Sequence, residues 1–252
     1  MSFDLSLLRD SGISWLDASG PESGIVLSTR VRLARNVQGL PFTIRTDEGH
    51  RAGILERVLE AGTASHHLEQ ATLYRLDEID PQDRQLMHER HLVSKELAGL
   101  EGQHGLRSSA AVLTNGELGV MINEEDHLRL QCLRSGFALG EAYSDLERLD
   151  SDLGGRLPFA FHPEFGYLTS CPTNAGTGLR ASVLIHLPGL VLTKEIAKVL
   201  QGLSQVGLTF RGLYGEGSEV VGNFFQLSNQ TTLGKSEDDL LDHLGKIVRQ
   251  VI

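Results

Sequence analysis

Two short apolar runs, at residues 110–115 and 118–123, meet at the dipeptide Asn115-Gly116. Asn-Gly favours the tight turns that join antiparallel strands in a hairpin. Further strand-like runs occur at 24–35, 71–76, 127–133, 165–169, 181–187, 207–212 and 223–228, and helical periodicity occurs at 47–67, 137–153, 193–204 and 236–251. Strands joined by short turns, with helices between the groups, predict an α+β fold: a largely antiparallel β-sheet flanked by helices.

Composition excludes several classes of function. The formal net charge of −10 argues against nucleic acid as a partner, because binding a phosphate backbone usually requires a basic surface. No apolar run approaches the length of a membrane-spanning helix, and the N-terminus lacks the pattern of a secretory signal. Two cysteines provide no disulfide framework, so we expect a cytoplasmic protein that binds neither membrane nor nucleic acid.

The common nucleotide and metal signatures are absent. The segment Asn229–Ser236 resembles a phosphate-binding loop, but it begins with asparagine and too few residues follow it to form the helix and sheet that such a loop serves. The segment His88–His91 resembles a zinc-protease helix, but its two histidines have the wrong spacing. Neither segment predicts a site.

Arginines instead occur on strand-like segments near acidic residues. Arg30 and Arg32 are two positions apart, so both side chains leave the same face of a strand. Arg129 follows Glu125 by four positions, Arg180 follows a glycine-rich stretch, and Arg211 precedes Glu216. Each arginine alone fits a surface charge or a structural ion pair. Together they are unusual, because arginine is a poor choice for strands that are to be buried.

Five motifs in this order resemble the catalytic domain of the phosphagen (guanidino) kinases, and most closely its bacterial protein-arginine kinase branch. The resemblance extends from about residue 20 to the C-terminus. The motifs are Leu27–Asn36, Asn123–Arg129, Ser170–Ser182, Arg211–Glu216 and Gly222–Gln230.

The resemblance implies a fold of the phosphagen-kinase and glutamine-synthetase type, with ATP and Mg²⁺ as cofactors. It places an arginine clamp on the ATP phosphates, where the planar guanidinium can bind phosphate oxygens bidentately. It also places a histidine, His91, near the nucleotide base, although His91 fits a surface or core role equally well. Mg²⁺ would be held by phosphates and water, without a protein metal site. The clamp residues are Arg30, Arg32, Arg129, Arg180 and Arg211.

For the acceptor, the resemblance assigns Glu125 and Glu216 to orient a guanidinium, one of them taking its proton. It places Cys171 beside the guanidinium as a thiolate, with a small buried residue as the alternative. We expect the neighbouring Glu124, Asp126 and Glu219 to be structural partners or solvated charges, Cys132 to fill the core and His127 to support a strand.

The resemblance also bears on domains and substrate. We expect a short extension at residues 1–20, forming an amphipathic helix, and a catalytic domain at 21–252. We expect neither the N-terminal domain that encloses small guanidino substrates nor the C-terminal phosphoarginine-binding domain. An uncovered site favours exposed arginines of protein substrates. A kinase of free arginine or another small guanidine, and an inactive nucleotide-binding regulatory paralogue, stay open, as does the need for an activator protein.

Overall fold

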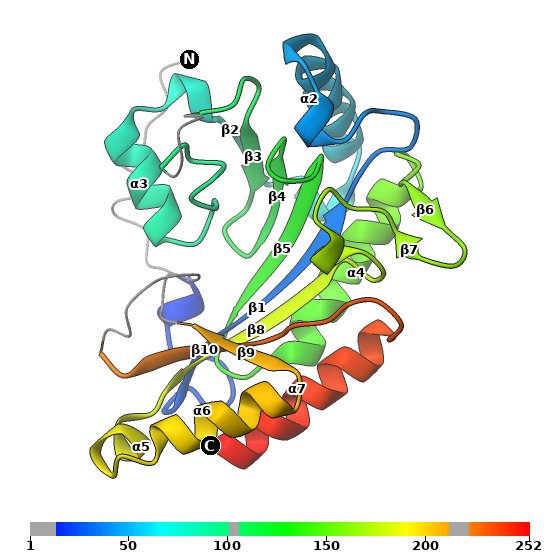
Figure 1. Ribbon diagram of the computed structural model, residues 1–252. Helices are drawn as coiled ribbons and strands as arrows, with labels where there is room; N and C mark the ends of the chain where they lie inside the picture. Colours follow the sequence, from blue (N-terminus) through cyan, green and yellow to red (C-terminus); the bar gives the residue numbers. More distant parts are fainter. Residues whose placement is uncertain (1–13, 101–105, 212–221) are drawn as a thin grey trace.

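The computed structural model describes residues 14–100, 106–211 and 222–252, and an eight-stranded sheet forms their centre (Figure 1). All neighbouring strands in this sheet pair antiparallel, which confirms the predicted fold class. The strand order is β2-β3-β4-β5-β1-β8-β10-β9. The strands are β1 (Val26–Arg35), β2 (Thr72–Arg75), β3 (Ala111–Thr114), β4 (Leu118–Ile122), β5 (Leu128–Ser135), β8 (Leu179–His186), β9 (Leu208–Arg211) and β10 (Phe224–Asn229).

The two faces of the sheet differ in chemistry because side chains alternate along each strand. On β1, Val31 and Leu33 belong to the main hydrophobic core, whereas Arg30 and Arg32 point to the other face. The neighbouring strands continue this division, with Leu130 and Val183 in the core. The sheet therefore has one apolar face and one face with an arginine-rich centre.

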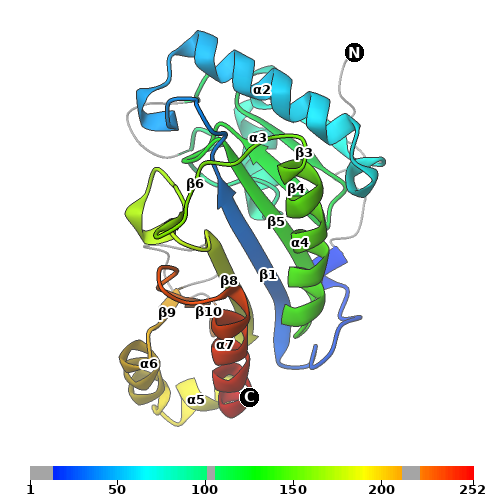
Figure 2. The same cartoon turned by 90° about the vertical axis from the view of Figure 1, so that its right-hand side faces the viewer.

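Helices cover the apolar face (Figure 2). α4 (Leu139–Gly154) lies along β1 and β5, α7 (Glu237–Val251) lies along β8 and β10, and α2 (Glu48–Thr63) packs on β4. Asp47 accepts a hydrogen bond from the backbone N–H of His50, and Ser236 begins α7 with a capping box. α5 (Pro188–Leu192) and α6 (Ile196–Gln205) follow β8, and α6 packs on β9.

A second hydrophobic cluster lies on the opposite face of the β2–β4 end. It joins α3 (Pro81–Glu89) and the segment 92–98 to Tyr74, Val112 and Met121 of the strands. This layer flanks the arginine-rich face and forms one wall of the cavity described below. The sequence pattern did not predict α3.

Four predicted elements differ in extent. The helix expected at 47–67 ends at Thr63 and is followed by a separate 3₁₀ turn at His66–Leu68. The strand expected at 165–169 is the two-residue β7 (Gly166–Tyr167), which pairs with β6 (Phe161–His162) as a separate hairpin. The helix expected at 193–204 begins at Ile196, because Lys194 has a left-handed φ of 63° that interrupts the helical path. Of the helix expected at 1–20, the structure describes only residues 14–20, where Ser14–Leu16 form a single 3₁₀ turn.

Candidate active site

A cavity of about 400 Å³ lies over the polar face of the sheet, and six arginines contribute to its lining, five of them from strands of the sheet. Arg30 and Arg32 come from β1, and Arg129, Arg180 and Arg211 come from β5, β8 and β9. Strand register explains their convergence: Arg32 pairs with Arg180 across β1 and β8, and Ala34 pairs with Arg129 across β1 and β5. The structure therefore brings together all five arginines predicted to form the clamp.

The arginines repel one another electrostatically. Burial, together with the charges of Arg129, Arg180 and Arg211, lowers the pKa of Arg30 to about 10. Burial and the charges of Arg30, Arg129 and Arg180 hold the pKa of Arg32 well below its ordinary value, although Glu124 acts in the opposite direction. The Nε atom of Arg32 is buried with no hydrogen-bond partner among the described residues. Such a cluster is suited to a ligand that carries several negative charges.

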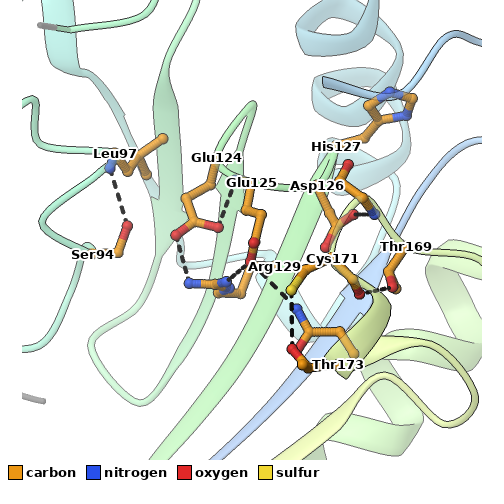
Figure 3. A network of polar contacts seen from close by, with 12 residues as sticks. Ser94, Leu97, Glu124, Glu125, Asp126, His127, Arg129, Thr169, Cys171 and Thr173 are labelled. Atoms are coloured by element: carbon orange, nitrogen blue, oxygen red, sulfur yellow. Dashed lines mark hydrogen bonds and ion pairs between the residues drawn. The ribbon is translucent and has the colours of Figure 1, made fainter. Parts of the chain in front are cut away.

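Two adjacent glutamates stand at one end of the cavity, in the turn between β4 and β5 (Figure 3). Arg129 donates to both: its Nη1 lies 2.5 Å from Glu124 Oε1, and its Nη2 lies 3.0 Å from Glu125 Oε2. Burial lowers the pKa of Arg129, but Glu124 and Glu125, together with the more weakly acting Glu96 and Asp126, outweigh burial and the net shift is upward. Arg129 therefore links the arginine cluster to the acidic end of the cavity.

The two glutamates differ in accessibility. The Glu124 side chain is 1% exposed, and its second oxygen accepts a hydrogen bond of 2.7 Å from the Glu125 backbone N–H. The Glu125 side chain is 40% exposed. Burial raises the pKa of Glu125, Arg129 lowers it, and Glu124 and Asp126 raise it again, leaving a net upward shift. Both oxygens of Glu124 are thus bound to protein groups and shielded from solvent, whereas Glu125 is accessible to a cation that enters the cavity.

Cys171 lies in the loop before β8, next to Glu125 (Figure 3). Its Sγ is 3.0 Å from Thr173 Oγ1, and Asn174 Nδ2 is 3.4 Å from Glu125 Oε2. Asp126 fixes the start of the loop, accepting hydrogen bonds from the Ser170 N–H at 2.6 Å and from Asn36 Nδ2 at 2.7 Å. A thiol, an amide and a carboxylate thus face one end of the cavity.

A family model described as the ATP:guanido phosphotransferase C-terminal catalytic domain matches residues 54–252. The chain belongs to the ATP:guanido phosphotransferase family. It is 45% identical over 242 residues to the protein-arginine kinase of Pelotomaculum thermopropionicum, covering 94% of this chain and 67% of the relative. It is 43% identical over 256 residues to the protein-arginine kinase of Bacillus cereus, covering all of this chain and 70% of the relative.

Solved structures of related enzymes share the fold of this phosphotransferase. The duplicated taurocyamine kinase from Schistosoma mansoni, solved with transition-state analogue components, superposes with a TM-score of 0.81 at 26% identity, covering 95% of this chain and 35% of that one. A lombricine kinase superposes with a TM-score of 0.79 at 23% identity, covering 94% of this chain and 69% of that one.

His91 lines the cavity of the phosphotransferase and directly contacts Arg30, one of the clustered arginines. Its Nδ1 lies 3.0 Å from Arg30 Nη1, and its ring packs edge-on against Trp15 with centroids 4.9 Å apart. Burial, Arg30, His88 and Arg32 hold the pKa of His91 well below its ordinary value. A neutral His91 accepts a hydrogen bond at Nδ1 and so fixes the position of Arg30.

The remaining predicted residues divide into three groups. Glu216 and Glu219 lie outside the described residues. Cys132 is fully buried in the core, and burial raises its pKa to about 12. His127 accepts at Nδ1 from the Val37 backbone N–H at 3.0 Å, and its Nε2 lies 2.9 Å from the carbonyl oxygen of Pro41. Cys132 and His127 thus occupy the structural positions expected from the sequence.

Several cavity residues received no role from the sequence. Gln226 accepts from Arg30 at 3.2 Å, Gln131 donates to the His91 carbonyl at 2.8 Å, and Arg107 donates to the Glu124 carbonyl. Gln131 and Gln226 could have been found from strand alternation, because they share the parity of Arg129 and of the polar Ser228 on their strands. Arg107 lies in an irregular segment that offers no such signal.

The described residues contain no group of three or more histidine, cysteine, aspartate or glutamate side chains arranged to hold a metal ion. Each carboxylate in the Glu124–Asp126 turn already contacts protein donors.

The described helices also lack the length and apolar character that crossing a bilayer requires.

Proposed function

We propose that this phosphotransferase moves the γ-phosphoryl group of MgATP onto a guanidinium nitrogen of arginine side chains in proteins. One observation carries the proposal: a cluster of arginines and an accessible glutamate, Glu125, line the same cavity and are joined by Arg129. A polyanion and a cation can therefore bind side by side. The protein-arginine kinases at 43% and 45% identity support the choice of protein arginine as the acceptor.

The arginine cluster supplies the electrostatic part of catalysis. Phosphoryl transfer proceeds mainly through positioning and charge stabilisation, because the transferring group carries negative charge on its oxygens. Arg30, Arg32 and Arg180 sit on adjacent central strands, which hold their guanidinium groups in a fixed array. Burial is the main reason why the pKa values of Arg30 and Arg32 are lowered, and ATP binding would relieve the second reason, the mutual repulsion of the arginines.

Mg²⁺ would enter with ATP, held by phosphate oxygens and water. This arrangement suits a hard cation that gives up its water reluctantly. The carboxylates of the Glu124–Asp126 turn support the same arrangement, because they already have protein partners: Glu124 binds Arg129, and Asp126 binds Ser170 and Asn36. Bound Mg²⁺ supplies charge neutralisation at the phosphates.

Glu125 would orient the acceptor. Its carboxylate can accept hydrogen bonds from a guanidinium, directing one nitrogen toward the γ-phosphorus. As the new N–P bond forms and the bond from the γ-phosphorus to the ADP oxygen breaks, one guanidinium proton passes to a carboxylate. Glu216 is proposed as the second carboxylate, and Cys171 as a contact to the guanidinium. The free Cys171 thiol facing the cavity suits the reducing cytosol, where we propose that the enzyme acts.

The test is incubation of the protein with MgATP and an arginine-rich unfolded protein, with free arginine in a parallel reaction. We expect acid-labile, base-stable phosphate on the protein and at least about tenfold lower kcat/KM for free arginine, or roughly 1.4 kcal/mol of transition-state binding. Equal or better use of free arginine would support a small-guanidine kinase instead. No phosphate on either acceptor would support an inactive nucleotide-binding protein.

A further inference from the structure

The β6–β7 hairpin carries a cluster of aromatic side chains that the proposed chemistry does not use. Phe161 is 56% exposed and Phe165 is 47% exposed. Phe161 packs edge-on against Tyr167 with centroids 5.2 Å apart, and Phe165 stacks on His162 at 4.9 Å. Figure 1 shows the hairpin projecting from the body of the protein, beside the loop that leads into β8. Large exposed aromatics that gather on one short hairpin mark a surface for interaction.

The hairpin is structurally continuous with the cavity wall. The Leu168 N–H donates to the Ala160 carbonyl at 2.9 Å, closing the base of the hairpin. Tyr167 and Gly176 exchange two backbone hydrogen bonds, of 2.7 and 3.2 Å, which tie β7 to the loop that carries Cys171. The aromatic side chains of the hairpin are therefore held in a fixed position relative to the part of the cavity that Glu125 and Cys171 line.

The charge of this region differs from that of the cavity. Residues 157–179 contain no lysine or arginine, and Glu164 is their only acidic residue. A chain segment that presents an arginine would be repelled by the arginine cluster, but it meets an apolar, weakly acidic surface at the hairpin. Exposed aromatic faces can also bind a second cationic side chain of such a segment.

We propose that Phe161 and Phe165 form a docking surface for the polypeptide that flanks the target arginine. This inference rests on the proposed function and concerns substrate selection. The arginine side chain enters the cavity beside Glu125 and Cys171, and neighbouring residues of the substrate pack on the two rings. Such remote contacts position the guanidinium without touching the reacting atoms. They also favour target arginines with apolar or aromatic neighbours.

The experiment compares the double variant Phe161→Ser/Phe165→Ser with the wild-type protein. The acceptors are a twelve-residue peptide with leucine and phenylalanine beside one arginine, and N-acetyl-arginine amide, which has no flanking residues. For the variant we expect kcat/KM for the peptide to fall about tenfold, or about 1.4 kcal/mol, and kcat/KM for the capped arginine to change less than about twofold. The Kd for MgATP should not change, since the hairpin lies outside the arginine cluster.

Two further variants complete the design. Phe161→Leu/Phe165→Leu keeps apolar area on the hairpin and should recover most of the lost activity. Leu192→Ser removes a leucine that is 81% exposed on α5, at the opposite end of the molecule in Figure 1, and should leave peptide activity unchanged. Wild-type kcat/KM for the peptide in the serine variant, or an equal loss with the capped arginine, would overturn the docking surface. Absence of phosphate on any peptide or protein with the wild-type enzyme would instead overturn the proposed function.

Discussion

Arg32 on β1 and Arg180 on β8 are directly paired in the antiparallel sheet, and their side chains share the cavity face. Like charges in directly opposed positions destabilise a sheet. Nothing in a sheet requires this arrangement, and in a purely structural protein a neutral pair would be more stable. The pairing is therefore a cost in stability, which we attribute to anion binding.

The first prediction follows from this cost. Arg32→Met removes one of the opposed charges and should raise stability without nucleotide, by on the order of 1 kcal/mol. Wild-type protein should gain thermal stability when MgATP is added, because a ligand that binds only the folded state stabilises it, and the variant should gain much less. Thermal unfolding with and without MgATP measures both effects. A variant less stable than wild type without nucleotide would contradict the interpretation.

The second prediction concerns the shape of the guanidinium. Arg180→Lys keeps the charge but loses the planar group that grips phosphate bidentately, so kcat should fall at least about tenfold while the protein stays folded. A matched control is Arg148→Lys on α4, where the side chain is 59% exposed and pairs with Asp145. That variant should keep wild-type kcat. Similar activity of the two variants would mean that Arg180 acts only as a distant charge.

The third prediction concerns Glu125 and pH. Its carboxylate must be ionised to bind a guanidinium, and burial raises its pKa. As the pH is lowered, protonation removes the charge that binds the guanidinium. Activity should therefore begin to fall at a pH higher than the one at which an ordinary glutamate titrates. Glu125→Gln should lower kcat by on the order of 10²-fold and abolish this acidic limb, with little change in MgATP affinity. We expect the same loss of kcat for Glu216→Gln.

The pH dependence of kcat/KM for wild type and Glu125→Gln tests this assignment. Glu141→Gln, an exposed position in the first turn of α4, serves as the control and should keep both the rate and the acidic limb. An acidic limb that persists unchanged in Glu125→Gln would assign the titration to another group.

The fourth prediction uses Trp15, the only tryptophan in the sequence. Its indole donates to the Arg90 carbonyl at 3.2 Å and packs against His91, which in turn contacts Arg30. Nucleotide binding should move Arg30 and His91 and so change the tryptophan fluorescence. Titration with MgATP should give a saturable signal whose Kd matches that from the thermal shift. In Arg32→Met the signal should require much higher concentrations, and a signal unchanged in that variant would contradict the coupling.

Sequence patterns predicted the sheet well because its strands are defined by local signals. Alternation in β1 and the Asn115-Gly116 turn fixed both pairing direction and the faces that Arg30 and Arg32 share. The sequence pattern did not predict α3, because Pro81–Glu89 is mostly polar and buries few of its side chains, so it lacks a wide apolar stripe. The sequence does contain a signal for the start of α3. Asp80 accepts hydrogen bonds from the Gln82 and Asp83 N–H groups, and a proline occupies the first helical position.

The site was predicted less completely, because the distinction between catalytic and structural residues depends on burial. Glu124 and Glu125 are adjacent and chemically identical, so only the family resemblance separated their roles in the sequence, and the fold adds the physical reason: Glu124 is enclosed while Glu125 faces the cavity. Arg35 is the clearest omission. It lies in the same motif as Arg30 and Arg32, but its odd position turns it to the apolar face, where its partners come from distant segments.

The last prediction concerns Arg35, which is 2% exposed. Its Nε and Nη2 donate to Asp150 on α4 at 2.9 and 2.8 Å, and its Nη1 donates to the carbonyls of Ala34 and Thr177, each at 2.9 Å. Its Cζ lies 3.5 Å from the centroid of the Tyr167 ring. Arg35 thus connects β1 and α4 to the β6–β7 hairpin and to the loop between Cys171 and β8.

Removing one partner of such a buried pair leaves the other charge without compensation. Arg35→Met should therefore destabilise the protein by about 3–5 kcal/mol, and the double variant Arg35→Met/Asp150→Leu should recover part of the loss. Chemical unfolding of the two single variants and the double variant measures the coupling. Because the Cys171 loop and the hairpin lose a common anchor, residual folded Arg35→Met should show reduced kcat/KM for protein acceptors while its Kd for MgATP stays close to wild type. A destabilisation below about 1 kcal/mol, or a loss of MgATP affinity equal to the loss of activity, would show that Arg35 does not anchor this end of the site.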